Sequence, residues 1–334
     1  MGGLLLSYNV LENIYEDKTM NYKPGTFEYI EAKIRSDAKG TEFGLDFEKV
    51  CKHYLETSPL FKNNLKKVWL WKEWPDRWKQ PEHGIDLVAI THDGDYWAIQ
   101  AKCFDPIYRV KYDDIDSFLT ESSRKLFSYR LLIATTNKIG ANARDAIEGK
   151  GKYAQAIPVG THLRNELVKA EVTWPTDINK KPTPLKPFDP KPHQKKAIDS
   201  VITKFKKADK GQLIMACGTG KTFTSIKIAE RLKAKRILVL VPSLNLVNQS
   251  IKEWNHNYKT PFKMCVVCSD ETVIKGKDAA TLSTASLSLP PTTNARKIKA
   301  FLKQNIKKPQ IVFCTYQSSN KIAEAQKKDL TKFD

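Results

Sequence analysis

The sequence predicts two α/β domains, the first with a mixed sheet flanked by helices and the second with a parallel sheet. Three observations lead to this fold class. Short apolar strands and helical patterns are mixed irregularly in the first half of the chain, whereas strands and helices alternate regularly in the second half. A stretch rich in proline and lysine, 174–192, has the composition of an extended linker. A length of 334 residues agrees with about two domains.

The first domain is predicted to open with a helix. Phe43, Phe47, Val50 and Tyr54 recur at helical spacing within 42–58. The elements expected after this helix are a strand at 67–71, a hairpin at 84–102, a helix at 113–122, a strand at 129–136 and a helix at 139–148. This order predicts a small mixed α/β domain.

The second domain is predicted to be a parallel sheet with helices on both faces, because its strands and helices alternate. The expected strands are 211–216, 236–241, 262–269 and 310–317. The expected helices are 221–233, 244–257 and 293–305.

The formal net charge of +19 indicates an anionic partner, and nucleic acid is the commonest one. A basic protein that is merely soluble is the alternative. No apolar run reaches the roughly 18 residues that span a bilayer, and the first residues lack the basic segment and long apolar run of a signal peptide. We therefore expect a cytoplasmic protein with no membrane partner.

The six cysteines are scattered through apolar segments, which indicates reduced thiols in the core. Cys265 and Cys268 have the spacing of metal ligands, but no second Cys/His pair lies near them in the sequence to complete four ligands. We assign them no metal.

The hairpin between "GID" and "QAK" carries polar residues at one end of two apolar strands. A two-residue loop would place Asp86 opposite Ala101, on the other face from Gln100. A three-residue loop, 92–94, places Asp86 opposite Gln100 and ends on Gly94, which such loops need in the left-handed conformation. This second register is the prediction.

In that register Asp86, Gln100 and Lys102 share one end of one face. A carboxylate and an amide carbonyl are hard oxygen donors that suit Mg²⁺. A bound cation lowers the pKa of its water, and Lys102 could orient that water or stabilise charge developing on a phosphate. A structural ion pair between Asp86 and Lys102 is the alternative, and the residues alone leave both open.

"GID", a short hairpin and "QAK" resemble the signature of PD-(D/E)XK nucleases in the Mrr-like variant, in which Gln replaces the acidic residue. The preceding "GTEFGLDFEKV" resembles the helix that opens these nucleases. The resemblance implies that Asp86 is the main metal ligand, Gln100 a second ligand and Lys102 the catalytic lysine. It also implies that Glu48 helps to complete the metal site, although a solvated charge on the helix surface is the alternative for Glu48.

The segment "MACGTGKT", 215–222, follows an apolar strand and opens a helix, which is the context of a phosphate-binding loop. Backbone N–H groups of such a loop cradle phosphates at the positive end of the helix. The lysine reaches the β- and γ-phosphates of ATP, and the following threonine holds Mg²⁺. The expected nucleotide ligands are Gly218, Thr219, Gly220, Lys221 and Thr222.

This loop resembles motif I of superfamily-2 helicases and translocases, with Met215 at the position of the first consensus glycine. The resemblance implies that Gln194, in "KPHQKKAIDS", reads adenine; a polar residue on a linker helix is the alternative. The segments 241–250 and 313–318 resemble the next two motifs, which contact the nucleic-acid backbone. Capped helix starts explain both segments equally well.

An acidic Walker B or DEAH pair is needed to complete Mg²⁺ binding and to activate water for ATP hydrolysis. No such pair follows the phosphate loop in a suitable context, and the sequence ends at "DLTKFD", where related sequences run into that strand. We therefore expect a fragment of a longer polypeptide that binds ATP poorly and hydrolyses it hardly at all.

Together these features resemble the N-terminal portion of type ISP, single-polypeptide restriction–modification enzymes. The resemblance implies a Mg²⁺-dependent DNA endonuclease coupled to an ATP-driven translocase of double-stranded DNA, with a methyltransferase and a target-recognition domain later in the polypeptide. The expected domains are an N-terminal extension (1–40), an Mrr-like nuclease (41–173), a linker (174–190) and the N-terminal part of a RecA-like ATPase truncated before the DEAH box (191–334).

Two functions from other classes remain open at this stage. One is a motor-driven DNA-binding or repair helicase whose nuclease fold is inactive. The other is an RNA helicase with an accessory domain. Loss of DNA nicking on substitution of Lys102, and stimulation of the ATPase by duplex DNA rather than by RNA, distinguish the restriction enzyme from these two.

Overall fold

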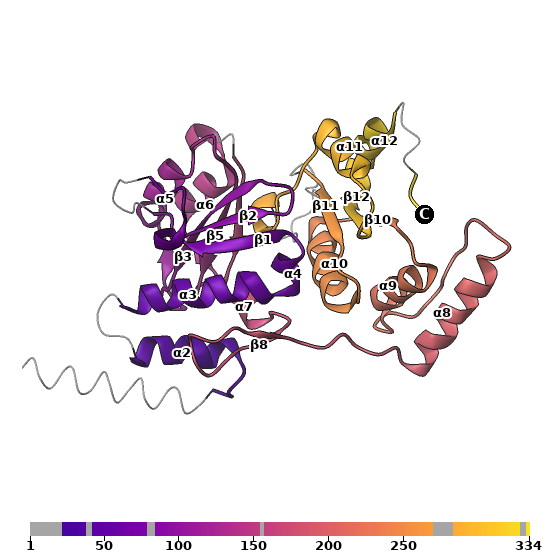
Figure 1. The fold of residues 1–334 in the computed structure, drawn as a ribbon, viewed down its shortest axis with the longest axis horizontal. Helices are drawn as coiled ribbons and strands as arrows, with labels where there is room; N and C mark the ends of the chain where they lie inside the picture. The colour runs from indigo at the N-terminus through magenta and orange to yellow at the C-terminus, as the bar shows by residue number, and fades with distance from the viewer. Residues whose placement is uncertain (1–21, 38–41, 79–83, 154–156, 270–282, 328–331) are drawn as a thin grey trace, which may run out of the picture. The chain divides into compact units, whose positions relative to one another are not determined.

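A computed structural model describes residues 22–37, 42–78, 84–153, 157–269, 283–327 and 332–334. The chain divides into two compact units. Unit 1 comprises residues 1–185 together with 285–288, and unit 2 comprises residues 186–284 and 289–334. Each unit has its own sheet (Figure 1).

Unit 1 is built on a five-stranded mixed sheet with the strand order β1-β2-β3-β5-β7. The strands are β1 (Leu65–Leu70), β2 (Leu87–Thr91), β3 (Tyr96–Lys102), β5 (Phe127–Ala134) and β7 (Val159–His162). β1, β2 and β3 are antiparallel neighbours, whereas β3, β5 and β7 run parallel. The mixed sheet predicted from the sequence is therefore confirmed.

Helices cover both faces of this sheet. Tyr54 of α3 contacts His162 on one face, and Ala143 and Ile147 of α6 pack with Val88 on the other. The helices of unit 1 are α2 (Phe27–Asp37), α3 (Glu42–Thr57), α4 (Pro59–Lys62), α5 (Asp116–Glu121), α6 (Ala141–Glu148) and α7 (Arg164–Val168). Its short elements are η1 (Trp71–Glu73), β4 (Arg109–Val110), η2 (Tyr112–Asp114), β6 (Lys138–Ile139), η3 (Gly151–Tyr153), β8 (Val172–Thr173) and β9 (Thr183–Pro184).

The expected extension and linker both contribute to the core of unit 1. α2 lies within the expected extension, yet Phe27, Ile30 and Ile34 on it are almost fully buried. Trp174, at the start of the expected linker, is 3% exposed and stacks on Tyr54 with ring centroids 5.1 Å apart. Local composition does not indicate this burial, because a few large apolar side chains gain enough free energy from burial to bring a polar or proline-rich segment into the core.

A segment from late in the sequence also belongs to unit 1. The hydroxyl of Thr161 on β7 donates to the carbonyl of Ala285 at 2.9 Å, and the hydroxyl of Tyr129 donates to that of Leu287 at 3.0 Å. Nδ1 of His162 lies 2.8 Å from Oγ of Ser288. Because Thr161 and His162 face opposite sides of the sheet, residues 285–288 cross the edge that β7 leaves open.

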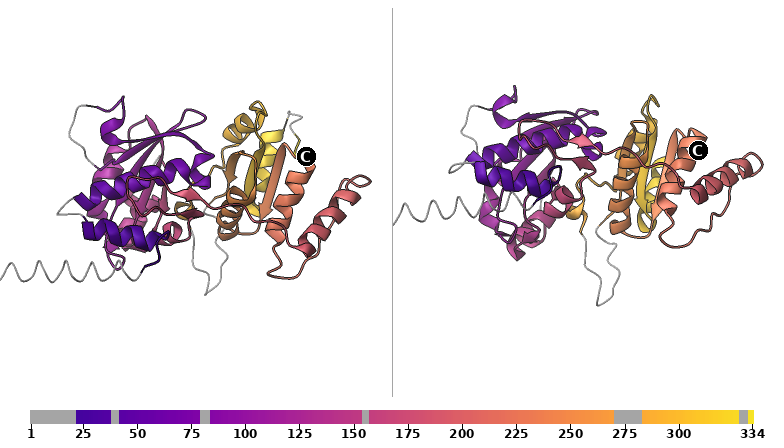
Figure 2. Two further views of the ribbon diagram at one scale, coloured as in Figure 1. Left: turned by 60° about the horizontal axis from the view of Figure 1, so that its bottom comes forward. Right: turned by 90° about the horizontal axis from the view of Figure 1, so that it is seen from below.

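Unit 2 has a three-stranded parallel sheet with the order β10-β12-β11. The strands are β10 (Arg236–Val241), β11 (Lys263–Val267) and β12 (Gln310–Thr315). The helices are α8 (Pro192–Lys204), α9 (Lys221–Leu232), α10 (Leu244–Asn257), α11 (Ala295–Lys303) and α12 (Ser319–Gln326), with short turns η4 (Thr284–Ser286) and η5 (Tyr316–Ser318). α11 and α12 cover one face of the sheet and α10 the other, which confirms the predicted layers (Figure 2).

The strand predicted at 211–216 is wrong, because these residues form no regular element. Ile214 is 84% exposed in spite of its apolar side chain. A strand needs a neighbour to pair its backbone N–H and C=O groups. Among the described residues no strand of unit 2 pairs with this segment, so its apolar composition alone does not make it a strand.

None of the helices that the structure describes is long and apolar enough to cross a membrane.

Candidate functional site

The hairpin of β2 and β3 has the predicted loop and register. Gly94 closes the loop with φ of +95°, and the N–H of Thr91 donates to the carbonyl of Asp95 at 2.9 Å. Ile90 pairs with Tyr96 and Leu87 with Ile99, which is the register of a three-residue loop. The loop forms because Gly94 is free to adopt a positive φ angle, and the register is fixed because both faces of the strands are buried.

Asp86 lies just before β2, where the regular ladder ends. Its N–H donates to the carbonyl of Ile99 at 3.0 Å, and its Oδ2 accepts the N–H of Ala101 at 2.7 Å. The expected direct ladder pair with Gln100 is therefore not formed, because the Asp86 carboxylate takes the place of a backbone acceptor. The carboxylate is instead held against the backbone of the residue between Gln100 and Lys102.

Gln100 is buried on the face of β3 that α6 covers. Its side chain is 1% exposed, and among the described residues its Oε1 has no hydrogen-bond partner. A buried carbonyl oxygen without a partner is costly and is satisfied in most proteins. An amide oxygen and the Asp86 carboxylate are both hard oxygen donors, so the chemistry of these residues fits a Mg²⁺ ion.

Lys102 ends β3, two residues beyond Gln100 and on the same face. It is half-buried, and its carbonyl accepts the N–H of Thr135 at 3.1 Å. β3 is therefore paired to its last residue, which fixes the backbone from which the Lys102 ammonium extends.

Glu48 lies on α3, three residues before Cys51. Burial is the main cause that raises the pKa of the Cys51 thiol well above its ordinary value, and the charges of Glu48 and Asp86 raise it further. Both carboxylates are therefore near the same buried thiol. The part of Glu48 in a metal site stays a prediction.

Among the described residues no group of three or more His, Cys, Asp or Glu side chains could hold a metal ion. A Mg²⁺ ion does not need such a group, because it keeps several water ligands and takes one or two from the protein.

The phosphate loop of unit 2 leads directly into α9. Gly218 and Gly220 have positive φ angles of +74° and +84°, which a side chain would strain. Lys221 is the first residue of α9, and its Nζ donates to the carbonyls of Met215 and Ala216 at 3.3 and 3.4 Å. Thr222 follows in the first turn. The structure thus has two features of a phosphate-binding site: a loop whose conformation needs glycine and a helix N-terminus that follows it.

Gln194 joins α8 to the phosphate loop. It is 6% exposed, its Oε1 accepts the N–H of Lys191 at 2.9 Å, and its Nε2 donates to the carbonyl of Thr219 at 3.0 Å. Both ends of the amide are thus used by backbone groups. To read adenine, Gln194 would have to give up one of these bonds.

The segments 241–250 and 313–318, which resemble helicase motifs that contact nucleic acid, differ in structure. Oγ of Ser243 accepts the N–H of Leu246 at 3.4 Å and so caps α10. Thr315, at the end of β12, is fully buried. The capped start is what the structure has at 243, and no contact tests a role in binding nucleic acid.

Three kinds of known protein match this chain. Residues 56–183 match the family described as restriction endonuclease, and residues 187–334 match the family described as type III restriction enzyme, res subunit. The structure of the ATP-dependent Type ISP restriction–modification enzyme LlaBIII bound to DNA is 30% identical over 92% of this chain, with a TM-score of 0.75.

The chain covers 20% of the LlaBIII polypeptide. A nuclease-deletion mutant of the Type ISP restriction–modification enzyme LlaGI, in complex with a DNA substrate mimic, is 34% identical over 44% of this chain and 14% of that chain, with a TM-score of 0.35. The comparison with curated proteins gave no match.

The order of the two families and the likeness to LlaBIII agree. The chain matches an N-terminal part of a Type ISP restriction–modification enzyme. It carries a restriction-endonuclease domain followed by a helicase-type domain, as the sequence resemblance predicted.

Sequence reasoning missed a buried carboxylate in unit 1. Glu31 on α2 is 4% exposed and contacts Arg35 and Arg164. The available signal was a Glu and an Arg spaced i, i+4 on a helix whose other face is apolar. Glu31 and Arg35 precede the endonuclease family match, which begins at residue 56.

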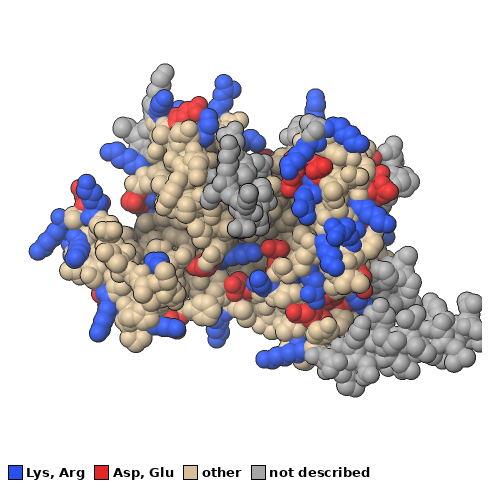
Figure 3. All heavy atoms as spheres, turned by 180° about the vertical axis from the view of Figure 1, so that it is seen from behind, with Lys and Arg blue, Asp and Glu red and all other residues tan. Residues whose placement is uncertain are grey.

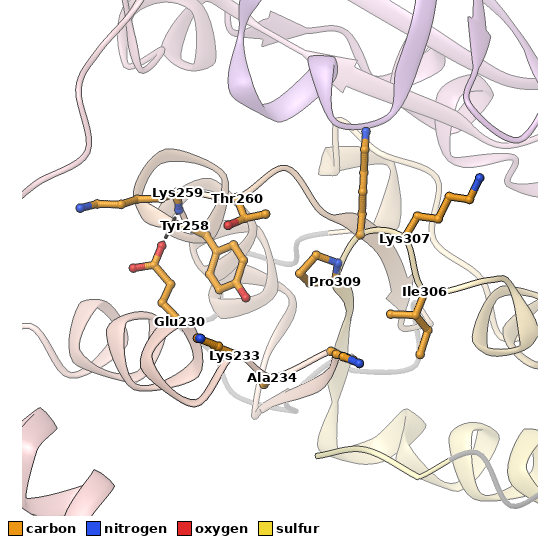
Figure 4. Close-up of a pocket in the computed structure, with 11 residues that line it drawn as sticks. Glu230, Lys233, Ala234, Tyr258, Lys259, Thr260, Ile306, Lys307 and Pro309 are labelled. Carbon is orange, nitrogen blue, oxygen red and sulfur yellow. Dashed lines mark hydrogen bonds between the residues drawn. The ribbon is translucent and has the colours of Figure 1, made fainter.

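A cavity of about 420 Å³ in unit 2 lies apart from the phosphate loop (Figure 4). It lies at the C-terminal end of α9, whereas the phosphate loop lies at the other end of that helix. Its single carboxylate, Glu230, accepts Nζ of Lys227 at 2.9 Å. The lysines that line it are Lys233, Lys235, Lys259, Lys307 and Lys308.

Proposed function

We propose that unit 1 is a Mg²⁺-dependent DNA endonuclease and that unit 2 is part of the ATP-driven motor that moves on duplex DNA, as in a Type ISP restriction enzyme. One observation carries the nuclease proposal. The Asp86 carboxylate is fixed on the N–H of Ala101, the residue that separates Gln100, with its buried and unpartnered amide oxygen, from Lys102 along β3. These are the donors and the charge that phosphodiester hydrolysis uses.

Asp86 and Gln100 would hold the ion, and Glu48 would add a second carboxyl group to the site. Mg²⁺ bound there would lower the pKa of a water ligand and neutralise charge on the scissile phosphate. The Lys102 ammonium places a positive charge where negative charge develops in the transition state, and it can donate a hydrogen bond to the attacking water. An amide at position 100 brings one negative charge less than a carboxylate, so a weaker metal site is expected.

The phosphate loop supports ATP as the ligand of unit 2. The N–H groups at the start of α9 and the glycines at 218 and 220 suit a triphosphate, and Thr222 would bind its Mg²⁺. Figure 3 shows Lys and Arg side chains scattered over the surface among fewer Asp and Glu side chains, and the net charge of +19 suits a DNA partner. We also propose a cytoplasmic location, and a methyltransferase and a target-recognition domain in the same polypeptide.

Nicking of supercoiled plasmid DNA with Mg²⁺ tests the nuclease. The wild-type chain is expected to cut, and Lys102→Ala is expected to lower the rate by about 10²-fold or more, because a positioned charge and proton donor is lost. Lys66→Ala, which removes an exposed lysine of β1, is the matched control and should cut at the wild-type rate. Equal, negligible cutting by wild type and Lys102→Ala would refute the nuclease and favour an inactive nuclease fold on a DNA motor.

A further inference from the structure

A buried ion cluster ties α2 to α7 in unit 1. The carboxylate of Glu31 is 5% exposed and lies between two guanidinium groups. Nε and Nη2 of Arg164 donate to its Oε2 at 3.1 and 2.9 Å, and Nη2 of Arg35 donates to its Oε1 at 3.2 Å. One anion therefore orients two cations in a place with little access to water.

Arg35 extends from this cluster to the segment that follows the candidate catalytic strand. Its Nη2 donates to the carbonyl of Phe104 and to Oγ1 of Thr135, the latter at 3.3 Å. Oγ1 of Thr135 donates to the same Phe104 carbonyl. The N–H of Thr135 donates to the carbonyl of Lys102. The cluster is thus connected, through the Arg35 side chain and Thr135, the residue after β5, to the carbonyls of Lys102 and Phe104 at the end of β3.

Stability alone is a poor reason for such a cluster. Burying the Glu31 carboxylate and partly burying two guanidinium groups costs desolvation energy, and apolar residues of similar volume often stabilise a core as well or better. What the cluster supplies is geometry, because Nη2 of Arg35 contacts Glu31 and also the Phe104 carbonyl and Oγ1 of Thr135. The groups fixed here are the two carbonyls at Lys102 and Phe104.

We propose that Glu31, Arg35 and Arg164 form a positioning cluster that sets where β3 ends and so holds Lys102 at the metal site. The proposal rests on the nuclease function proposed for unit 1. The three residues do not touch the reacting atoms; they act through the backbone on either side of Lys102. Displacing a catalytic group by about 1 Å can lower the reaction rate by about 10²-fold. A small shift in the backbone at Lys102 is therefore sufficient to slow cutting.

The test compares Arg35→Lys and Thr135→Val with the wild-type chain. Arg35→Lys keeps the positive charge but replaces the planar guanidinium, whose Nη2 makes these contacts, with a shorter ammonium side chain. Thr135→Val keeps the shape of a fully buried side chain but loses its hydroxyl. Single-turnover cutting is expected to fall about 10- to 100-fold in each. The Kd for a labelled duplex and the Mg²⁺ concentration for half-maximal cutting should stay unchanged, because neither the DNA contacts nor the metal ligands are altered.

Arg124→Lys is the matched control, since Arg124, just after α5, forms an exposed ion pair with Glu121 at 2.8 Å. It should cut at the wild-type rate. A purely structural cluster would lower the melting temperature of the Arg35 and Thr135 variants without lowering the cutting rate of the folded protein. That result, or wild-type cutting by Thr135→Val, overturns the proposal.

The two proposals fail differently. If the wild-type chain does not cut DNA, the nuclease function fails. If wild type cuts, Lys102→Ala does not, and the Arg35 and Thr135 variants cut normally, the nuclease function stands and the positioning cluster is refuted.

Discussion

The Asp86 carboxylate accepts the backbone N–H of Ala101 at 2.7 Å, so one side chain both completes the sheet and presents a metal ligand. These two roles can be separated, because asparagine also offers a carbonyl oxygen to the N–H but has no negative charge.

Asp86→Asn is therefore expected to keep the stability of unit 1 and to lose Mg²⁺-dependent cutting. Asp86→Ala should lose both, with the free energy of unfolding reduced by about 1–3 kcal/mol relative to Asp86→Asn, because the N–H of Ala101 is left without a partner. Urea unfolding and plasmid nicking measure the two effects. Cutting by Asp86→Asn at the wild-type rate would exclude Asp86 as a metal ligand.

Gln100→Glu is expected to lower the Mg²⁺ concentration needed for half-maximal cutting. The substitution keeps the size of the side chain and adds a negative charge at a site where Oε1 has no partner among the described residues. Without metal the same variant should be less stable than wild type, because a buried carboxylate near Asp86 is unfavourable. A Mg²⁺ titration of cutting, and melting with and without Mg²⁺, check both expectations; an unchanged titration midpoint counts against Gln100 as a ligand.

The hairpin could be predicted because its determinants are local. Gly94 permits the loop, and the alternation of side chains then fixes which residues pair. The departure of Asp86 from the ladder could not be predicted in this way. Its carboxylate competes with backbone carbonyls for the N–H of Ala101, and the alternation of residues along a strand does not indicate which acceptor forms the hydrogen bond.

Elements that depend on distant partners were the ones mispredicted. Residues 211–216 are as apolar as a buried strand but pair with no described strand, and Ile214 is exposed. Trp174 lies in a proline-rich stretch but packs on Tyr54, 120 positions earlier in the numbering. Glu31 and Arg35 were overlooked because their partners, Arg164 and Thr135, are on elements that only the fold brings near.

Gly160→Ala is expected to destabilise unit 1. A Cβ at this position would lie 2.5 Å from the carbonyl of Leu287 and would collide with the hydroxyl of Tyr129. Overpacking of this kind costs about 1–3 kcal/mol of unfolding free energy. Gly44→Ala on α3 is the control, since a Cβ there meets nothing within 4 Å, and it should stabilise by up to about 1 kcal/mol. If both variants unfold at the same denaturant concentration as wild type, residues 285–288 do not pack on β7.

Cys217 is expected to be alkylated first at pH 8, and MgATP is expected to protect it. Cys217 is exposed in the phosphate loop, whereas burial raises the pKa of Cys103 to about 11 and the pKa values of Cys265 and Cys314 to about 12. A raised pKa keeps these three thiols protonated, and therefore unreactive, until the pH exceeds about 11.

Mass spectrometry after a short pulse of iodoacetamide measures which thiol reacts. Protection by MgATP but not by adenosine, and its loss in Lys221→Ala, would place the phosphates on the loop, because only they reach the start of α9. Equal labelling of Cys217 with and without MgATP, at nucleotide concentrations up to the millimolar range, would mean that this chain does not bind the triphosphate through its phosphate loop.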